Sequence, residues 1–225
     1  SAFAAEHLDR LGITWARMGV PEFKPKQAET WLETKGETFP FSDAARAVLD
    51  AGGRVLGLIN FKDTATWVES GDEGYLDVVS ECTRKMVETH KDRIHHWEVI
   101  NEPDVFSRGV TPQQMAPIVK AAIRGARHAD PDCFLLSPCP TSITYMEALL
   151  EEGIGPMVDG FAFHVYSQGG AMPNVLRHWK QLYADYGQGD KPVWITETGW
   201  RSDVGHAEGE AEKAQWFRHL DENGR

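Results

Sequence analysis

The stretch Arg54-Val55-Leu56-Gly57-Leu58-Ile59-Asn60-Phe61 decides the fold class of this sequence. Its apolar residues do not alternate with polar ones, so a strand built from it is buried on both faces. Strands of this kind occur in parallel sheets that helices cover on both sides. Five further β-rich stretches, most of them apolar on both faces, are residues 13–19, 95–101, 133–138, 160–166 and 192–198.

Amphipathic stretches with helical spacing lie between these predicted strands. Residues 43–51 follow Ser42, and residues 113–129 follow Thr111-Pro112, which are typical N-cap and first-turn residues. The remaining helical stretches are residues 3–11, 73–91, 143–152, 171–186 and 208–221. Regular alternation of strand and helix predicts parallel βα units without an internal linker.

Six βα units are compatible with a closed (β/α) barrel or with a doubly wound open sheet. The open sheet favours a Gly-rich fingerprint after its first strand, whereas Met18-Gly19-Val20-Pro21 follows here. We therefore predict an α/β fold, a (β/α)₈ TIM barrel in which barrel strands 2 to 7 are recognisable. Strands 1 and 8 are expected outside residues 1–225, which would form a single barrel domain truncated at both ends. The alternative is a natural open barrel with two unpaired edges.

Composition and charge narrow the classes of partner. A net charge of −11 argues against nucleic acid, which requires a basic face. No apolar run approaches the roughly 18 residues of a membrane span, and no signal peptide is visible, so no membrane partner is expected. Localisation stays open, with a secreted or periplasmic site compatible, and the sequence does not fix the oligomeric state. Cys82, Cys133 and Cys139 are predicted to be free thiols.

Two predicted strands end in a glutamate that precedes a strand-breaking residue. Glu102 is followed by Pro103, which cannot continue a central strand, and Glu197 is followed two residues later by Gly199. Both acids should therefore lie at the carboxyl rim, where barrel enzymes keep their chemistry. Hydrolysis of a glycoside with retention requires such a pair about 5 to 5.5 Å apart.

The sequences around these acids resemble the motifs of clan A glycoside hydrolases, the retaining β-glycosidases with TIM barrels. Residues 97–104 (WEVINEPD) resemble the acid/base motif, and residues 193–200 (VWITETGW) resemble the nucleophile motif. The resemblance covers barrel strands 2 to 7 and is greatest to family 39 and related cellulase-like members. It implies that Glu102 is the acid/base and Glu197 the nucleophile.

The resemblance also implies five substrate-binding residues. Arg17 would contact the nucleophile, Asn101 would bind the sugar 2-hydroxyl, and His164 and Tyr166 would lie near the two acids, while Trp200 is the candidate for stacking on a sugar. No cofactor and no metal are expected. The implied reaction is hydrolysis of a β-linked oligo- or polysaccharide by double displacement through a covalent glycosyl-enzyme. The expected partner is thus a carbohydrate substrate.

Alternative interpretations concern both single residues and the whole chain. Glu98 shares a strand face with Glu102 but should lie about 13 Å lower, which favours a structural ion pair over catalysis. The chain could instead be a non-hydrolytic carbohydrate-binding barrel or an inactive fragment. A third hypothesis is a metal-dependent hydrolase with Glu102, His164 and Glu197 as ligands, although no HExxH motif supports it.

Overall fold

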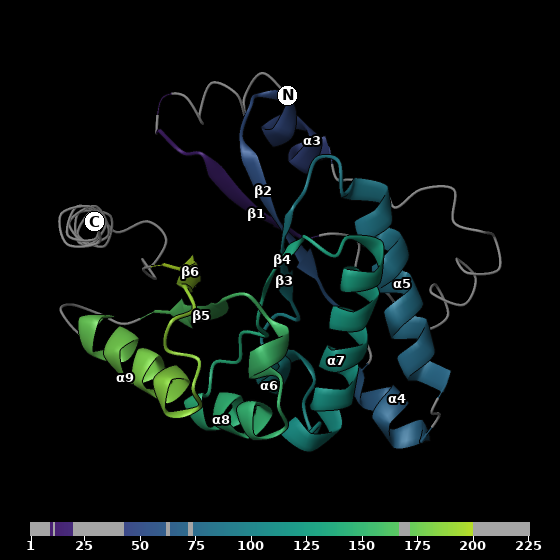
Figure 1. Cartoon of the computed structure of the whole chain (residues 1–225), viewed down its shortest axis with the longest axis vertical. Coiled ribbons are helices and arrows are strands. Elements are labelled where there is room, and N and C mark those ends of the chain that lie inside the picture. Colours follow the sequence, from purple (N-terminus) through teal and green to yellow (C-terminus); the bar gives the residue numbers. More distant parts are fainter. Residues whose placement is uncertain are drawn as a thin grey trace, which may run out of the picture.

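The computed structural model of this chain describes residues 10, 12–19, 43–61, 64–71, 74–166 and 172–199 (Figure 1). Every predicted strand is present in these ranges, most of them shortened by one to three residues. The strands are β1 (Trp15–Gly19), β2 (Arg54–Ile59), β3 (His96–Val99), β4 (Phe134–Leu136), β5 (Phe161–Val165) and β6 (Val193–Thr198).

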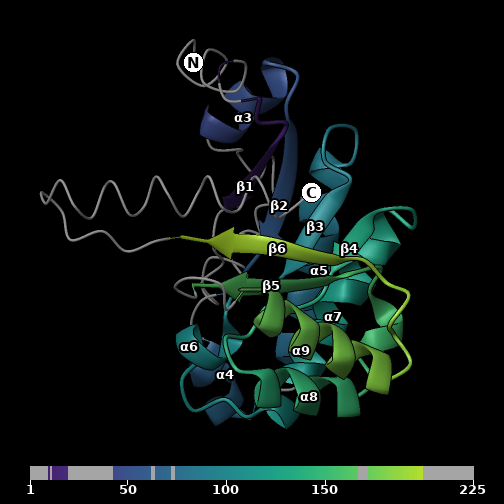
Figure 2. The ribbon, with the colours of Figure 1, turned by 90° about the vertical axis from the view of Figure 1, so that its left-hand side faces the viewer.

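The strands run parallel and follow one another around part of a barrel. β1 to β4 pair in sequence order, β5 pairs with β6, and a parallel bridge between Leu136 and Gly160 links the two groups. Figure 2 shows the arrowheads of β5 and β6 pointing to the side of the molecule on which α6 lies. Among the described residues β1 and β6 each have one pairing neighbour. The predicted α/β class and the incomplete TIM barrel are confirmed.

Helices cover the outside of the strands. They are α3 (Asp43–Asp50), α4 (Thr64–Ser70), α5 (Gly74–His90), α6 (Pro103–Phe106), α7 (Pro112–Ala129), α8 (Ile143–Glu151) and α9 (Met172–Asp185), together with the 3₁₀ turn η1 (Gly155–Met157). The sequence did not predict α4 and α6. Apart from residue 10, the predicted helices 3–11 and 208–221 lie outside the described residues.

Helix α7 begins as its sequence predicts. The Thr111 hydroxyl accepts a hydrogen bond from the backbone N–H of Gln114, and the Gln114 side chain accepts one from the backbone N–H of Thr111. This capping box satisfies two donors that the first turn leaves open. The helix then packs closely against α5, because Gly125 has no side chain where the backbone of Ser80 passes. No described helix is long and apolar enough to cross a membrane.

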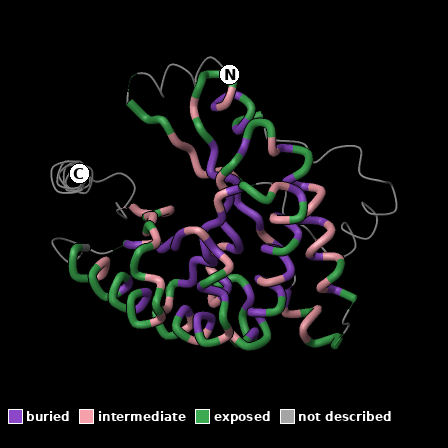
Figure 3. The backbone as a smooth tube through the Cα atoms, viewed as in Figure 1, coloured by how far each residue is buried: buried purple, intermediate pink, exposed green. Residues whose placement is uncertain are grey.

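Burial differs between the middle and the edges of the strand series. β2 and β3 are almost wholly buried, whereas the residues of β1 and β6 are partly exposed. Figure 3 shows the buried backbone gathered in the centre of the molecule. Trp97 fills the space beside Gly57, whose missing Cβ would lie 2.5 Å from the indole. The three cysteines are buried free thiols, as predicted.

Four aromatic rings meet inside the curve of the strands, near their amino ends. Trp15 of β1 contacts His96 of β3 and Trp194 of β6, with ring centroids 4.8 and 5.3 Å apart. Phe134 of β4 lies 5.1 Å from His96 and 5.9 Å from Trp194. Side chains rather than backbone pairing therefore connect β1 with β6 at this level.

Candidate active site

Glu102 lies just after β3, where the backbone leaves the extended conformation. Ile100 has φ 64° and Glu102 has φ 39°, both in the left-handed region. This region is unfavourable for a β-branched residue, and such strain occurs most often at functional sites. The carboxylates of Glu98 and Glu102 both approach His164, so Glu98 reaches the site from its lower position on the strand. The ion pair expected for Glu98 is present, with Arg17 as its partner.

Backbone hydrogen bonds hold this turn in place. Ile100 donates to the Ile59 carbonyl at 2.7 Å, and Cys139 donates to the Ile100 carbonyl at 3.2 Å. Glu102 donates to the Cys139 carbonyl at 3.0 Å, and its own carbonyl accepts from Val105 and Phe106 of α6, each at 2.9 Å. The position of Glu102 is thus fixed by main-chain bonds to two neighbouring strand ends and to the helix that follows.

The Glu102 carboxylate contacts a buried imidazole. Glu102 Oε1 lies 2.7 Å from His164 Nδ1, and the side chains are 14% and 2% exposed. His164 Nε2, on the opposite side of the ring, lies 3.8 Å from Glu197 Oε2 and 4.0 Å from Glu98 Oε1. His164 at the end of β5 therefore stands between all three acids.

Glu197, on β6, is held by two side chains from other strands. Arg17 Nη1 donates to Glu197 Oε2 at 3.1 Å, and the Tyr166 hydroxyl donates to Glu197 Oε1. Burial, the hydrogen bond to Glu197 and that carboxylate's charge raise the pKa of Tyr166 to about 12. The phenol therefore keeps its proton at neutral pH and remains a donor to the carboxylate.

Arg17 is the centre of this side-chain network. Its Nε and Nη2 donate to the two oxygens of Glu98 at 3.0 and 2.6 Å, and Nη2 also donates to Asn101 Oδ1 at 2.6 Å. Burial alone would lower the pKa of Arg17, but the hydrogen bond to Glu98 and the charges of Glu98 and Glu197 raise it above its ordinary value. The guanidinium is a permanent cation beside Glu197.

Glu102, His164 and Glu197 also form a group with the donor types of a metal site. One ligand atom from each lies within 4.8 Å of the others. Within this group His164 Nδ1 contacts Glu102, and Arg17 Nη1 from outside the group donates to Glu197. A cation bound here would lie near the guanidinium, which opposes it by charge repulsion.

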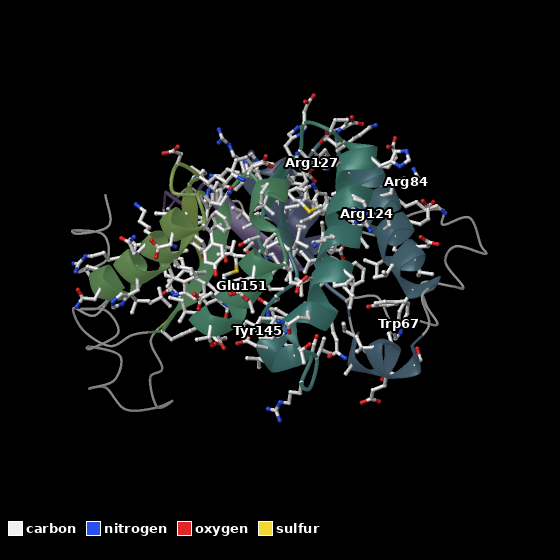
Figure 4. The ribbon with its side chains drawn as sticks, turned by 60° about the horizontal axis from the view of Figure 1, so that its bottom comes forward. Trp67, Arg84, Arg124, Arg127, Tyr145 and Glu151 are labelled. Atoms are coloured by element: carbon white, nitrogen blue, oxygen red, sulfur yellow. The ribbon has the colours of Figure 1, made fainter. Side chains whose placement is uncertain are left out.

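The structure thus brings together Arg17, Asn101, Glu102, His164, Tyr166 and Glu197, while Trp200 lies outside the described residues. Two other aromatic residues, Trp67 and Tyr75, pack against each other and line a pocket between α4, α5 and α7. Figure 4 shows Trp67 on this outer helix layer.

Sequence reasoning did not single out two residues of α6, which begins directly after Glu102. The Asp104 carboxylate accepts from the backbone N–H groups of Thr141 and Ser142 at 3.0 and 2.9 Å, which ties α6 to the start of α8. Phe106 is 69% exposed and donates its N–H to the Glu102 carbonyl. The sequence signal for Phe106 was an aromatic residue four positions after a candidate acid.

Solved structures share this fold. The chain aligns with a glucosidase from Croceicoccus marinus at TM-score 0.64 and 16% identity, covering 91% of this chain and 48% of that one. A psychrophilic family 10 endo-β-1,4-xylanase gives TM-score 0.62 and 17% identity, with 96% and 77% covered. A β-glucuronidase 2 from Bacteroides uniformis, covalently bound to cyclophellitol-6-carboxylate aziridine, gives 0.54 and 17%, with 90% and 23% covered.

These neighbours share the (β/α) barrel fold of this chain. Residues 71–222, more than half of the chain, match the glycosyl hydrolase catalytic core family, and the chain belongs to that family. It spans about half the length of the glucosidase and about a quarter of the glucuronidase. None of the curated protein sequences compared with the chain matches it.

Proposed function

We propose that this catalytic core hydrolyses β-glycosides with retention of configuration, with Glu197 as nucleophile and Glu102 as acid/base. The observation that carries the proposal is the convergence of the two carboxylates. A Glu102 oxygen and a Glu197 oxygen lie within 4.8 Å of each other, with His164 between them. A short separation supports retention, because inverting enzymes leave about 6.5 to 9.5 Å for a water molecule.

The surroundings of the two acids support opposite roles. Glu197 accepts from Arg17 and Tyr166, and hydrogen bonds from donors stabilise an ionised carboxylate. Among the described residues, the ion partner of Glu102 is the imidazole of His164, and no guanidinium or ammonium group is paired with it. An ionised attacking group beside a proton donor is what the first step of double displacement requires.

The reaction then proceeds in two balanced steps. Glu197 attacks the anomeric carbon while Glu102 gives its proton to the departing glycosidic oxygen, which leaves a glycosyl ester on Glu197. Glu102, now ionised, takes a proton from water as the water attacks the same carbon and releases Glu197. His164, in hydrogen-bond contact with Glu102, is placed to orient that carboxylate in both steps.

The substrate is proposed to be a β-linked oligo- or polysaccharide, and residues 1–225 are proposed to act as one catalytic barrel domain. The structural neighbours named as a glucosidase, a xylanase and a β-glucuronidase all support a sugar substrate. The net charge of −11 also favours a neutral substrate over an anionic one.

Covalent trapping tests the proposal directly. The protein is incubated with 2-deoxy-2-fluoro-β-glucosyl and β-xylosyl fluorides, and the labelled peptide is located by mass spectrometry. We expect a label on Glu197 and none on the Glu197→Gln variant. The exposed Glu147 of α8 provides the matched control, since Glu147→Gln should label at the wild-type rate.

Azide rescue separates the two carboxylates by product stereochemistry. In Glu102→Ala, azide should replace water in the second step and give the β-glycosyl azide. In Glu197→Ala, azide should attack the substrate itself and give the α-glycosyl azide. Label on another residue, or the same anomer from both variants, would contradict the assigned roles.

The same experiments decide between the proposal and its alternatives. Retained oligosaccharide binding without label or turnover would indicate a carbohydrate-binding barrel. Loss of turnover on treatment with a chelator, restored by a divalent cation, would indicate the metal-dependent hydrolase.

A further inference from the structure

We propose that Glu98 is a positioning residue that orients Arg17 and balances its charge beside the nucleophile. The inference rests on the proposed role of Glu197. It assigns to a third carboxylate, below the catalytic pair, control over the pH range in which the pair works.

The geometry of Glu98 is that of a fixed support. Its side chain is fully buried, and both oxygens accept hydrogen bonds from Arg17, at 3.0 and 2.6 Å. A planar guanidinium held in two parallel bonds has one defined orientation. The remaining nitrogen, Nη1, is thereby directed at Glu197, while Nη2 also reaches Asn101.

Glu98 also balances the positive charge of Arg17. The Arg17 guanidinium lies between the carboxylates of Glu98 and Glu197, and the His164 imidazole faces both carboxylates, at 4.0 and 3.8 Å. With Glu98 ionised, Arg17 and Glu98 together are neutral, so Glu197 meets a hydrogen-bond donor without a net positive charge. Without the Glu98 charge, Glu197 would face an unbalanced cation at 3.1 Å.

An unbalanced cation has two predicted effects on double displacement. It stabilises the ionised form of Glu197, so the acidic limit of activity moves downward. It also opposes the positive charge that the sugar ring develops in the transition state, which slows formation of the glycosyl-enzyme.

The test compares Glu98→Gln with the wild type by the pH profile of kcat/KM and of the rate of labelling by the 2-fluoro sugar fluoride. Gln keeps the volume and one acceptor but removes the charge. We expect kcat to fall at least about 10-fold with KM little changed, and the acidic limb of both profiles to move down by about one pH unit.

Glu81→Gln is the matched control. Glu81 also accepts two hydrogen bonds from an arginine, Arg84, at 2.7 and 2.8 Å, but this pair lies on the surface of α5 (Figure 4). It should leave both pH profiles unchanged. Glu98→Asp keeps the charge but shortens the support, so kcat should fall while the limbs stay in place.

The outcomes distinguish this proposal from the proposed function. A wild-type protein that is labelled on Glu197, with a Glu98→Gln profile unmoved on the pH axis, overturns the role of Glu98 alone. Wild-type protein without label overturns the proposed function. If Glu98→Gln does not fold, Glu98→Asp decides, because a wild-type kcat in that variant contradicts a positioning role.

Discussion

Strands β3 and β6 both lead to a candidate catalytic glutamate, but the structure holds the two acids by different means. β3 lies between two partners and is buried, and main-chain hydrogen bonds to neighbouring strand ends fix Glu102. β6 is partly exposed, and Glu197 is held by Arg17 of β1 and by Tyr166, which directly follows β5. The proposed acid/base is therefore positioned by main-chain bonds, whereas the proposed nucleophile depends on side-chain contacts.

Among the changes near the edge strands β1 and β6, removal of Arg17 should cause the largest loss of stability. Arg17→Met leaves Glu98 buried without its ion partner, so we expect the free energy of unfolding to fall by about 3–5 kcal/mol. Denaturant unfolding measures this loss. Arg84→Met, which breaks the exposed pair on α5, should cost less than about 1 kcal/mol; equal losses would show that the Arg17 network is no more important than a surface pair.

A pair of glycine substitutions tests the contrast in packing. In Gly57→Ala of β2 the new Cβ would lie 2.5 Å from the Trp97 ring, whereas Gly19→Ala of β1 meets nothing within 4 Å. We expect a loss of about 1–3 kcal/mol for the first and a change within about 0.5 kcal/mol for the second. Thermal unfolding compares the two variants. A larger loss of stability for Gly19→Ala would contradict the tighter packing of β2 relative to β1.

Tyr166→Phe removes the second hydrogen bond of Glu197, the proposed nucleophile. Tyr166 is 56% exposed, so removing its hydroxyl should leave stability almost unchanged. We expect kcat/KM to fall by about 10-fold, since Glu197 loses one charge-assisted hydrogen bond worth about 1.5–3 kcal/mol at most. Steady-state kinetics on an aryl β-glycoside measure the loss. A clear fall in melting temperature that accompanies the loss of kcat/KM would instead indicate that Tyr166 is a packing residue.

The smallest predicted effect concerns acid sensitivity at the amino ends of the strands. Burial, together with the neighbouring positive charges of His95 and Arg54, lowers the pKa of His96 below its ordinary value of 6.5. The unfolded chain therefore takes up a proton first as the pH falls, so the contribution of His96 to stability is present above pH 6.5 and is lost below it. His96→Phe should reduce this loss of melting temperature between pH 7 and 5.

The control for this experiment is an exposed histidine on α9, His178. His178→Gln should keep the acid sensitivity of the wild type. If both variants lose it equally, protonation of His96 is not its cause.

The strand order and most of the candidate site were predictable because they depend on local sequence signals. Apolar runs, Pro103 and Gly199 mark the strands and their ends, and a parallel barrel brings those ends to one rim. Glu102 and Glu197 therefore lie close together, as expected. The free thiols followed in the same way from strand spacing, which separates Cys133 from Cys139.

The relation of Glu98 to the site was not predictable, because it depends on a backbone conformation that the sequence disfavours. Isoleucine rarely adopts φ 64°, so the sequence of residues 97–102 does not predict the turn at Ile100. The hydrogen bonds of Ile100 to Ile59, at the end of β2, and to Cys139, after β4, stabilise it. Helix α6 was missed for a related reason, since four residues give too short a periodic signal.

The contact between Trp15 and Trp194 gives this protein an optical signal of its own. The two indole rings lie 5.3 Å apart and almost perpendicular, at 87°, and they belong to the first and last of the described strands. We expect the electronic transitions of indoles this close to couple and to give a circular dichroism couplet that neither ring produces alone. That couplet reports the distance between two chain segments almost 180 residues apart without any attached label, and replacing either tryptophan by phenylalanine removes it.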